Sequence, residues 1–446
     1  MSTARHRPSV DTRPGGTTPT LTRAETVKVT VGATAGTVLE WYDYFLFGTL
    51  AALVFNRLFF PDVTPMTGIL LSLSTFSVGF LGRPLGGIVF GHIGDRHGRL
   101  VAFRVSLVLA GGATLAMGLL PTYASAGLVA PALLVLLRFV QGVGLGGEYG
   151  GATIVMAEAA RPRRRGFVAS WAQWAAPAGQ LLGLGAVGLM SAALPEAAFR
   201  EWGWRVPFLV SAVLVVLGYY LRLRMVETEQ LRRYLSATNR ERSPLRQVLT
   251  DHRKALLITI GSRMSSDVTI YVVSVFSLAY LTTALGVSSD VALSAVIVGN
   301  ALQMIVIPLG AIVGDRIGRR PVYVFGAVAA GAWGFAFFPL LGTRGTVPIM
   351  VAICGGLVAQ AIVSSGHAAF HVERFTTNVR YSGVSVGYQL GGVIGGGIAP
   401  TVAFGLFAAF DSWVPVAVYL AVAAVATIVA AALAEERNRI SLDEVP

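Results

Sequence analysis

The sequence Gly94-Asp95-Arg96-His97-Gly98-Arg99 returns about half the chain later as Gly314-Asp315-Arg316-Ile317-Gly318-Arg319. Each copy joins two long apolar segments, so each forms a charged turn between hydrophobic elements. A pattern that repeats at half-length is typical of a duplicated unit. The chain is therefore predicted to consist of two related halves.

The composition places the chain in a membrane. Hydrophobic residues make up 54% and charged residues 13% of the chain, and the mean hydropathy is +0.66, whereas a soluble domain carries roughly a quarter charged residues. A run of about 20 apolar residues spans the hydrocarbon core of a bilayer. Twelve such runs begin near Val31, Met66, Val101, Ala126, Gly166, Val206, Ala255, Val291, Val322, Val347, Tyr381 and Trp413. This content excludes a soluble enzyme, and the chain has no Gly-Lys-Ser/Thr nucleotide loop.

One hydrophilic stretch divides the runs into six plus six. We therefore expect an all-α membrane protein with two six-helix bundles related by a pseudo-two-fold axis, at residues 29–222 and 255–434. Residues 223–254 form the predicted cytoplasmic linker. Residues 1–28 are interpreted as a disordered cytoplasmic tail, and residues 435–446 as a second cytoplasmic tail.

The basic residues predict the orientation. The N-terminal tail and every second loop are rich in arginine, whereas the alternate loops carry few basic residues. Basic loops stay on the cytoplasmic side, so both termini are expected in the cytoplasm and the protein in the cytoplasmic membrane. The net charge of +12 then reflects topology and contact with anionic lipid, and no nucleic-acid partner is expected.

The duplicated turn carries the first resemblance. Gly91 to Leu100 is similar to the loop motif between the second and third helices of the major facilitator superfamily, and the region from about Val29 to Ala434 resembles that family throughout. The resemblance implies a cytoplasmic latch in which Asp95 lies against the start of the eleventh helix and Asp315 against the start of the fifth, because helix N-termini favour a carboxylate. The predicted latch residues are Gly91, Gly94, Asp95, Arg96, Gly98, Arg99, Glu158, Gly314, Asp315, Arg316, Gly318 and Arg319. The alternative is a plain basic loop that only sets topology.

Four further stretches follow in order along the chain. They are Glu40-Trp41-Tyr42-Asp43-Tyr44, Arg138-x-x-Gln141-Gly142-x-Gly144-x-Gly146-Gly147-Glu148, Gly203-Trp204-Arg205-Val206-Pro207-Phe208, and Asn378-Val379-Arg380-Tyr381-Ser382-Gly383 continuing to Gly387-Tyr388-Gln389-Leu390-Gly391-Gly392. Together they resemble the metabolite:proton symporter branch, which holds shikimate, 2-oxoglutarate, citrate, dicarboxylate and proline/betaine permeases.

The resemblance to this branch implies a proton-coupled importer of a small organic acid that works by alternating access. We expect it to act as a monomer, with no enzymatic activity and no cofactor. Two alternatives stay open: a proton symporter of a zwitterionic osmolyte such as proline or glycine betaine, and a membrane sensor on the same fold that transports nothing.

Two carboxylates on the first helix are the candidates for proton coupling. Glu40 and Asp43 are three residues apart and share a helix face. A charge inside the membrane is costly unless it faces a cavity, a partner or a proton. Either residue could be the proton carrier, and the alternative is that Asp43 only pairs with an arginine.

Arginines on two helices are the candidates for substrate binding. Arg138 on the fourth helix is predicted to act as a counter-ion for a carboxylate or as a clamp for an anionic substrate, with Gln141 beside it. Arg263 on the seventh helix is predicted to bind substrate with Asp267 as its gate partner, or else to form a self-neutralising pair with Asp267 four residues on. By contrast, Arg83 and Arg104 are interpreted as snorkelling from helix ends.

Polar residues on three further helical segments complete the candidate set. Tyr271 lies one turn beyond Asp267 and supplies a hydroxyl, or packs as most tyrosines do, and Tyr388 and Gln389 would present polar atoms to a cavity. His367 and His371 are four residues apart, which suits a relay, a structural pair or a zinc site. Because no third ligand is evident, we predict no metal.

Overall fold

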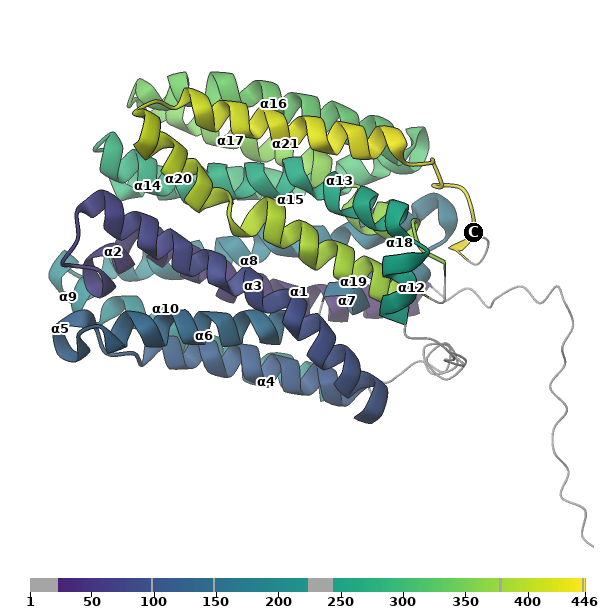
Figure 1. Cartoon of the computed structure of the whole chain (residues 1–446), viewed down its shortest axis with the longest axis horizontal. Coiled ribbons are helices and arrows are strands. Elements are labelled where there is room, and N and C mark those ends of the chain that lie inside the picture. Colours follow the sequence, from purple (N-terminus) through teal and green to yellow (C-terminus); the bar gives the residue numbers. More distant parts are fainter. Residues whose placement is uncertain are drawn as a thin grey trace, which may run out of the picture.

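A computed structural model describes residues 23–97, 99–146, 149–223, 244–376, 379–442 and 445. Most of the predicted N-terminal tail and of the predicted linker lie outside these residues. Long helices run side by side along the molecule (Figure 1). The first helix begins at Arg23, inside the range predicted to be a tail.

The first half begins with the helix α1 and ends with α10. Its elements are α1 (Arg23–Leu50), η1 (Ala51–Phe55), α2 (Asn56–Phe59), α3 (Pro65–His97), α4 (Arg99–Gly118), α5 (Tyr123–Ala126), α6 (Val129–Leu145), α7 (Tyr149–Glu158), η2 (Pro162–Arg164), α8 (Arg165–Ala193), α9 (Glu196–Glu201), η3 (Gly203–Arg205) and α10 (Val206–Leu223).

The second half begins with a short helix before its first long one. Its elements are α12 (Pro244–Thr250), α13 (Arg253–Tyr271), η4 (Val272–Phe276), α14 (Ser277–Ala279), η5 (Tyr280–Ala284), α15 (Ser289–Ile317), α16 (Arg319–Gly342), α17 (Thr346–Ser364), α18 (His367–Val372), α19 (Arg380–Gly391), η6 (Gly392–Gly397), α20 (Ala399–Phe410) and α21 (Val414–Leu433). Four segments, η1, η4, η5 and η6, are π-helical, a geometry that is frequent at functional sites.

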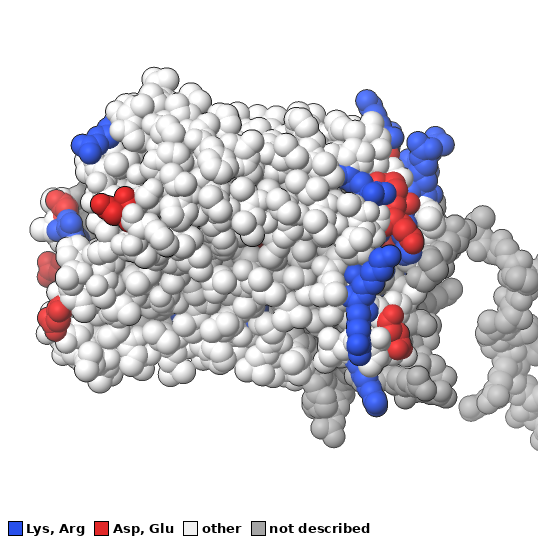
Figure 2. All heavy atoms as spheres, turned by 45° about the horizontal axis from the view of Figure 1, so that its top comes forward, with Lys and Arg blue, Asp and Glu red and all other residues white. Residues whose placement is uncertain are grey.

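The described residues contain ten helical spans long and apolar enough to cross a membrane, and two shorter apolar helices at Val105–Gly118 and Gly203–Leu217. These twelve coincide with the twelve apolar runs of the sequence. Charged side chains gather at the two ends of the face that Figure 2 shows, and the broad band between them is uncharged. The end where Arg165, Arg319 and Arg380 lie is called the basic end below, and the opposite end the far end.

Glycines let α3 and α6 cross at very close range. A Cβ added to Gly142 of α6 would lie 1.9 Å from the carbonyl oxygen of Gly79, and one added to Gly86 of α3 would lie 1.9 Å from the carbonyl oxygen of Val143. Such contacts are impossible for any larger residue, as at other small-residue helix crossings in membranes. The crossing brings the middle of α3 against the C-terminal part of α6.

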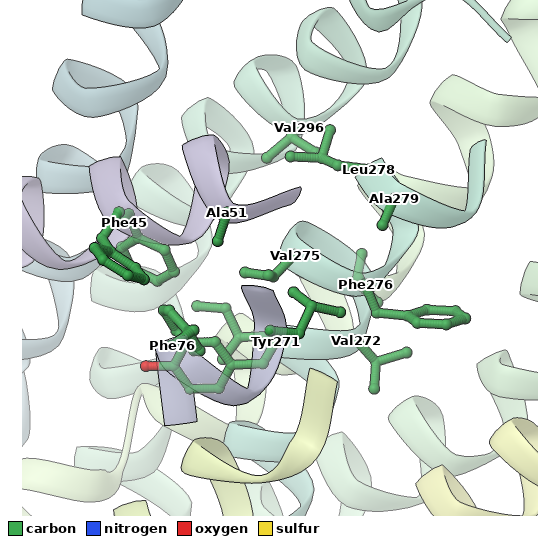
Figure 3. Packing of buried hydrophobic residues seen from close by; sticks show 14 of the residues in the cluster. Phe45, Ala51, Phe76, Tyr271, Val272, Val275, Phe276, Leu278, Ala279 and Val296 are labelled. Carbon is green, nitrogen blue, oxygen red and sulfur yellow. The ribbon is translucent and has the colours of Figure 1, made fainter. Parts of the chain in front are cut away.

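The two halves meet along both ends of the molecule. Toward the far end, Phe45 and Phe76 of the first half pack against Tyr271, with ring centroids 5.9 and 5.6 Å apart, and Figure 3 shows these rings beside Val275 and Phe276. At the basic end, Ile154 and Ala157 belong to one buried cluster with Ala368 and Val372. Apolar contacts therefore close the seam between the halves at either end.

Candidate functional site

A chain of hydrogen bonds connects Asp43 to Arg138. The Asp43 side chain on α1 is buried, and its Oδ2 lies 3.1 Å from the hydroxyl of Thr114 on α4. The amide Nε2 of Gln141 donates to the same hydroxyl at 2.7 Å, and Arg138 Nη1 donates to Gln141 Oε1. The sequence predicted the two ends of this chain and Gln141, but Thr114 was missed because a threonine in an apolar helix carries no distinguishing signal.

Arg138 is fully buried among aromatic rings. Its Cζ lies 4.1 Å from the ring centroid of Tyr44, 4.3 Å from Phe47 and 5.0 Å from Phe76, distances suited to cation–π attraction. Nε and Nη2 make no hydrogen bond among the described residues. Among the residues that the structure describes, Arg138 thus contacts no carboxylate directly, and its link to Asp43 passes through Gln141 and Thr114.

The interpretation of Arg83 as a snorkelling residue is wrong. Its side chain on α3 is 2% exposed, and its Cζ lies 4.3 Å from the Tyr44 ring centroid and 4.9 Å from Phe80. The close crossing of α3 and α6 draws this part of α3 into the interior, which hydropathy alone does not reveal. The side chain of Arg104 lies outside the described residues.

Arg263 and Asp267 form a direct ion pair on α13. Arg263 Nε donates to Asp267 Oδ2 at 2.8 Å, and Nη2 lies 2.8 Å from the same oxygen. The Arg263 Cζ also lies 3.3 Å from the ring centroid of Tyr388, which in turn stacks on Tyr149 with centroids 3.3 Å apart. This arrangement fits both interpretations of the pair, since Nη1 of Arg263 is buried without a hydrogen-bond partner.

The remaining polar candidates lie at the seam or inside the second half. Tyr271 is packed by aromatic rings, including Phe80 at 5.5 Å. Gln389 donates from Nε2 to the carbonyl oxygen of Gly146 at 3.1 Å, across the seam. His367 and His371 stack at 5.3 Å, and His371 Nε2 lies 3.0 Å from the Ser262 hydroxyl. The histidines are therefore packed within the second half, away from the Asp43 chain.

At the basic end, Asp315 lies against the N-terminus of α8. Its two carboxylate oxygens accept the backbone N–H groups of Gly166 and Phe167, each at 2.9 Å. Arg319 Nη2 contacts Asp315 Oδ1 at 2.7 Å, as well as Oε1 of the buried Glu373 at 3.5 Å. This is the position that the family resemblance implied for Asp315, while its action as a latch stays a prediction.

The other residues of the second turn surround this contact. Gly314 is buried in the last turn of α15 and Arg316 is exposed. Gly318, between α15 and α16, has a φ of +104°, a conformation that L-residues with a Cβ rarely adopt. Of the first copy, Gly98 lies outside the described residues, and so do the side chains of Asp95, Arg96 and Arg99. The latch roles of these four residues, and those of Gly91 and Gly94, therefore stay predictions.

A further set of ion pairs crosses the seam at the basic end. Arg380 of α19 pairs with Glu158 of α7 at 3.1 Å, and Arg165 of α8 pairs with Glu373 at 3.1 Å. The C-terminal segment covers both: Arg165 donates to the carbonyl oxygen of Ile440, and Arg380 to that of Leu442. The sequence did not indicate this role for the C-terminal residues.

A family model of the Major Facilitator Superfamily matches residues 34–400. The chain belongs to the Major Facilitator Superfamily. It is 38% identical to the shikimate transporter of Escherichia coli K12, over 96% of this chain and 99% of that protein. It is 32% identical to the proline/betaine transporter of Salmonella typhimurium, over 92% of this chain and 84% of that protein.

A solved structure of the proton:xylose symporter XylE is similar in fold, with a TM-score of 0.76, 18% sequence identity, and coverage of 95% of this chain and 98% of that one. The predicted twelve-helix architecture of the major facilitator superfamily is therefore confirmed, and so is the resemblance to the group that holds shikimate and proline/betaine transporters. The protein is a multi-pass membrane transporter and not an enzyme.

Proposed function

We propose that this protein is a proton-coupled symporter that imports a small organic anion across the cytoplasmic membrane. Its two bundles, residues 29–222 and 255–434, would rock about the buried charges, with both termini in the cytoplasm. The observation that carries the proposal is the chain from Asp43 through Thr114 and Gln141 to Arg138. A carboxyl group with no direct cationic contact is costly to keep charged in the membrane, which is what a proton carrier requires.

The Thr114 hydroxyl allows this chain to respond to a proton. When Asp43 is charged, Thr114 donates its single hydrogen to Asp43 Oδ2 at 3.1 Å. When Asp43 is protonated, the carboxyl becomes the donor, and the Thr114 hydrogen turns to the carbonyl oxygen of Ala110, which is already 3.0 Å away. The Gln141 contact persists in both states, because an oxygen of a hydroxyl accepts two hydrogen bonds.

Protonation removes the negative charge of Asp43, which lies at the opposite end of the hydrogen-bond chain from Arg138. Arg138 cannot deprotonate, and its Nε and Nη2 groups are buried without partners. The guanidinium then favours a second anion, so the proton and an anionic substrate bind more tightly together than separately. This linkage is the thermodynamic requirement for symport.

The relatives support an organic anion as the substrate, but they do not identify which one. One is named a shikimate transporter, and shikimate is a cyclic monocarboxylate. The alternative substrate, a zwitterion such as betaine, is supported by the proline/betaine relatives and by the aromatic faces around Arg138, because such faces also bind quaternary ammonium groups.

The test is uptake into proteoliposomes of labelled shikimate, protocatechuate, citrate, proline and betaine, with a pH gradient and a membrane potential imposed separately. A monoanion that enters with one proton moves no net charge, so it accumulates with the pH gradient alone. A zwitterion with one proton gains about 2.3 kcal/mol per 100 mV of potential. Betaine or proline uptake driven by the potential would replace the anion proposal with the osmolyte one.

The Asp43→Asn variant tests the proton carrier. It should keep exchange of labelled for unlabelled substrate, yet lose accumulation driven by the pH gradient, because exchange needs no net proton movement. Asp290→Asn is the matched control, since Asp290 is an exposed carboxylate in the first turn of α15. If the pH gradient drives accumulation by the Asp43 variant to the level of the control, another group carries the proton.

A further inference from the structure

Arg83 is a buried charge that the proposed function does not use. Its side chain is 2% exposed, and its Nε and Nη2 groups make no hydrogen bond among the described residues. It lies seven residues inside the end of the span Pro65–Phe90, about 10 Å along the helix, too deep for its guanidinium to reach the headgroups. A buried N–H group that carries charge and lacks a partner is costly, so its retention points to a ligand.

The surroundings of Arg83 are aromatic. Its guanidinium lies over the rings of Tyr44 at 4.3 Å, Phe80 at 4.9 Å and Trp41 at 5.7 Å. Aromatic faces stabilise the cation and leave its N–H edge available to an anion.

Arg83 also lies beside the seam between the two halves. Its neighbour Phe80 packs so closely on η6 that a Cβ added to Gly397 would lie 2.6 Å from the Phe80 Cβ. The ring of Phe80 is 5.5 Å from that of Tyr271 on α13. A ligand bound by Arg83 would therefore touch both halves, as alternating access demands.

We propose that Arg83 binds the carboxylate of the transported anion, and that this anion carries a flat ring that lies against Tyr44 and Phe80. This assignment rests on the proposed function. In this assignment, Arg138 responds to the protonation state of Asp43, and Arg83 binds the substrate.

The test compares a ring monocarboxylate with its own primary amide. Shikimate or protocatechuate, whichever the wild-type protein accumulates, and the corresponding amide compete for binding to the purified full chain, with bound radiolabel as the measure. Wild-type protein should prefer the acid. In Arg83→Gln the acid should lose roughly 10- to 100-fold in affinity, while the amide changes little, because only the charge-assisted hydrogen bonds are removed.

Two further variants keep the test decisive. Arg83→Lys retains the charge but not the forked geometry, so its acid affinity should fall between wild type and Arg83→Gln. Arg200→Gln removes an exposed arginine of α9 and should match wild type. Equal losses for acid and amide in Arg83→Gln, or no loss for either, would overturn the assignment.

Failure of the proposed function looks different. If the wild-type protein binds none of the carboxylates, the anion proposal fails, and the assignment of Arg83 fails with it. If the wild type binds the acid and Arg83→Gln binds it equally well, only the assignment of Arg83 fails.

Discussion

Replacement of Asp315 by asparagine should open the basic end of the transporter. The carboxylate accepts two backbone N–H groups of α8 at 2.9 Å and pairs with Arg319 at 2.7 Å. Asparagine has one acceptor oxygen and turns an N–H₂ group toward the other donor. One charge-assisted hydrogen bond is lost, about 1.5–3 kcal/mol, and the favourable charge at the helix N-terminus adds about 0.3–1 kcal/mol.

This free energy acts on a conformational equilibrium. Asp315 belongs to the second half and α8 to the first, so the contact exists only while the basic end is closed. Its loss should raise the ratio of open to closed molecules roughly 20- to 900-fold. A basic end that is open in about 1% of molecules would then be open in about 17% to 90%.

Cysteine labelling measures this population. The single native cysteine, Cys354, is replaced by serine, and Ala157→Cys places a thiol in the buried cluster that closes the basic end, where Ala157 is 0% exposed. If the basic end is open in about 1% of wild-type molecules, a membrane-permeant maleimide should label this thiol about 17- to 90-fold faster with Asp315→Asn.

Asp411→Asn is the matched control for the labelling experiment. Asp411 is exposed and adopts a left-handed conformation with φ of 46°, which asparagine tolerates well, so labelling should stay at the wild-type rate. An Asp315→Asn rate within twofold of the control would refute the idea that this carboxylate holds the halves together.

Two other predictions follow from contacts of the structure. Gly142→Ala should lower the melting temperature in detergent by several degrees, because its Cβ would lie 1.9 Å from the Gly79 carbonyl oxygen, whereas Gly185→Ala meets nothing within 4 Å and should melt like wild type. Equal melting temperatures would contradict the close helix crossing. Truncation that removes residues 440–446 should speed labelling of the Ala157→Cys thiol, since two arginines lose backbone acceptors there; an unchanged rate would show that the segment does not hold the basic end closed.

Much of the fold was accessible from the sequence. A span must be apolar over its whole length, because the bilayer offers no hydrogen bonds to an unpaired backbone. The twelve runs therefore mark the twelve membrane helices directly. The paired Gly-Asp-Arg-x-Gly-Arg turns show the duplication in the same direct way, and the contact of Asp315 with α8 lies where the family resemblance implied it.

The candidate site was accessible only in part. Asp43, Arg138 and Arg263 stand out because an ionisable residue in an apolar run is rare and costly. Thr114 and Tyr44 do not stand out, because threonine and tyrosine are common in apolar helices. Their importance comes from the residues that they touch, and those residues are far away in the sequence.

The sequence by itself determined the membrane class, the twelve spans and the two-fold repeat, since each depends on composition and on spacing along one chain. The tertiary structure alone decided which buried charges meet. Hydropathy reports how deep a residue lies in the bilayer but not which way its helix face turns, and that direction depends on contacts such as the glycine crossing of α3 and α6. For this reason the sequence led to an interpretation of Arg83 as snorkelling from a helix end, whereas its side chain is buried in the folded protein.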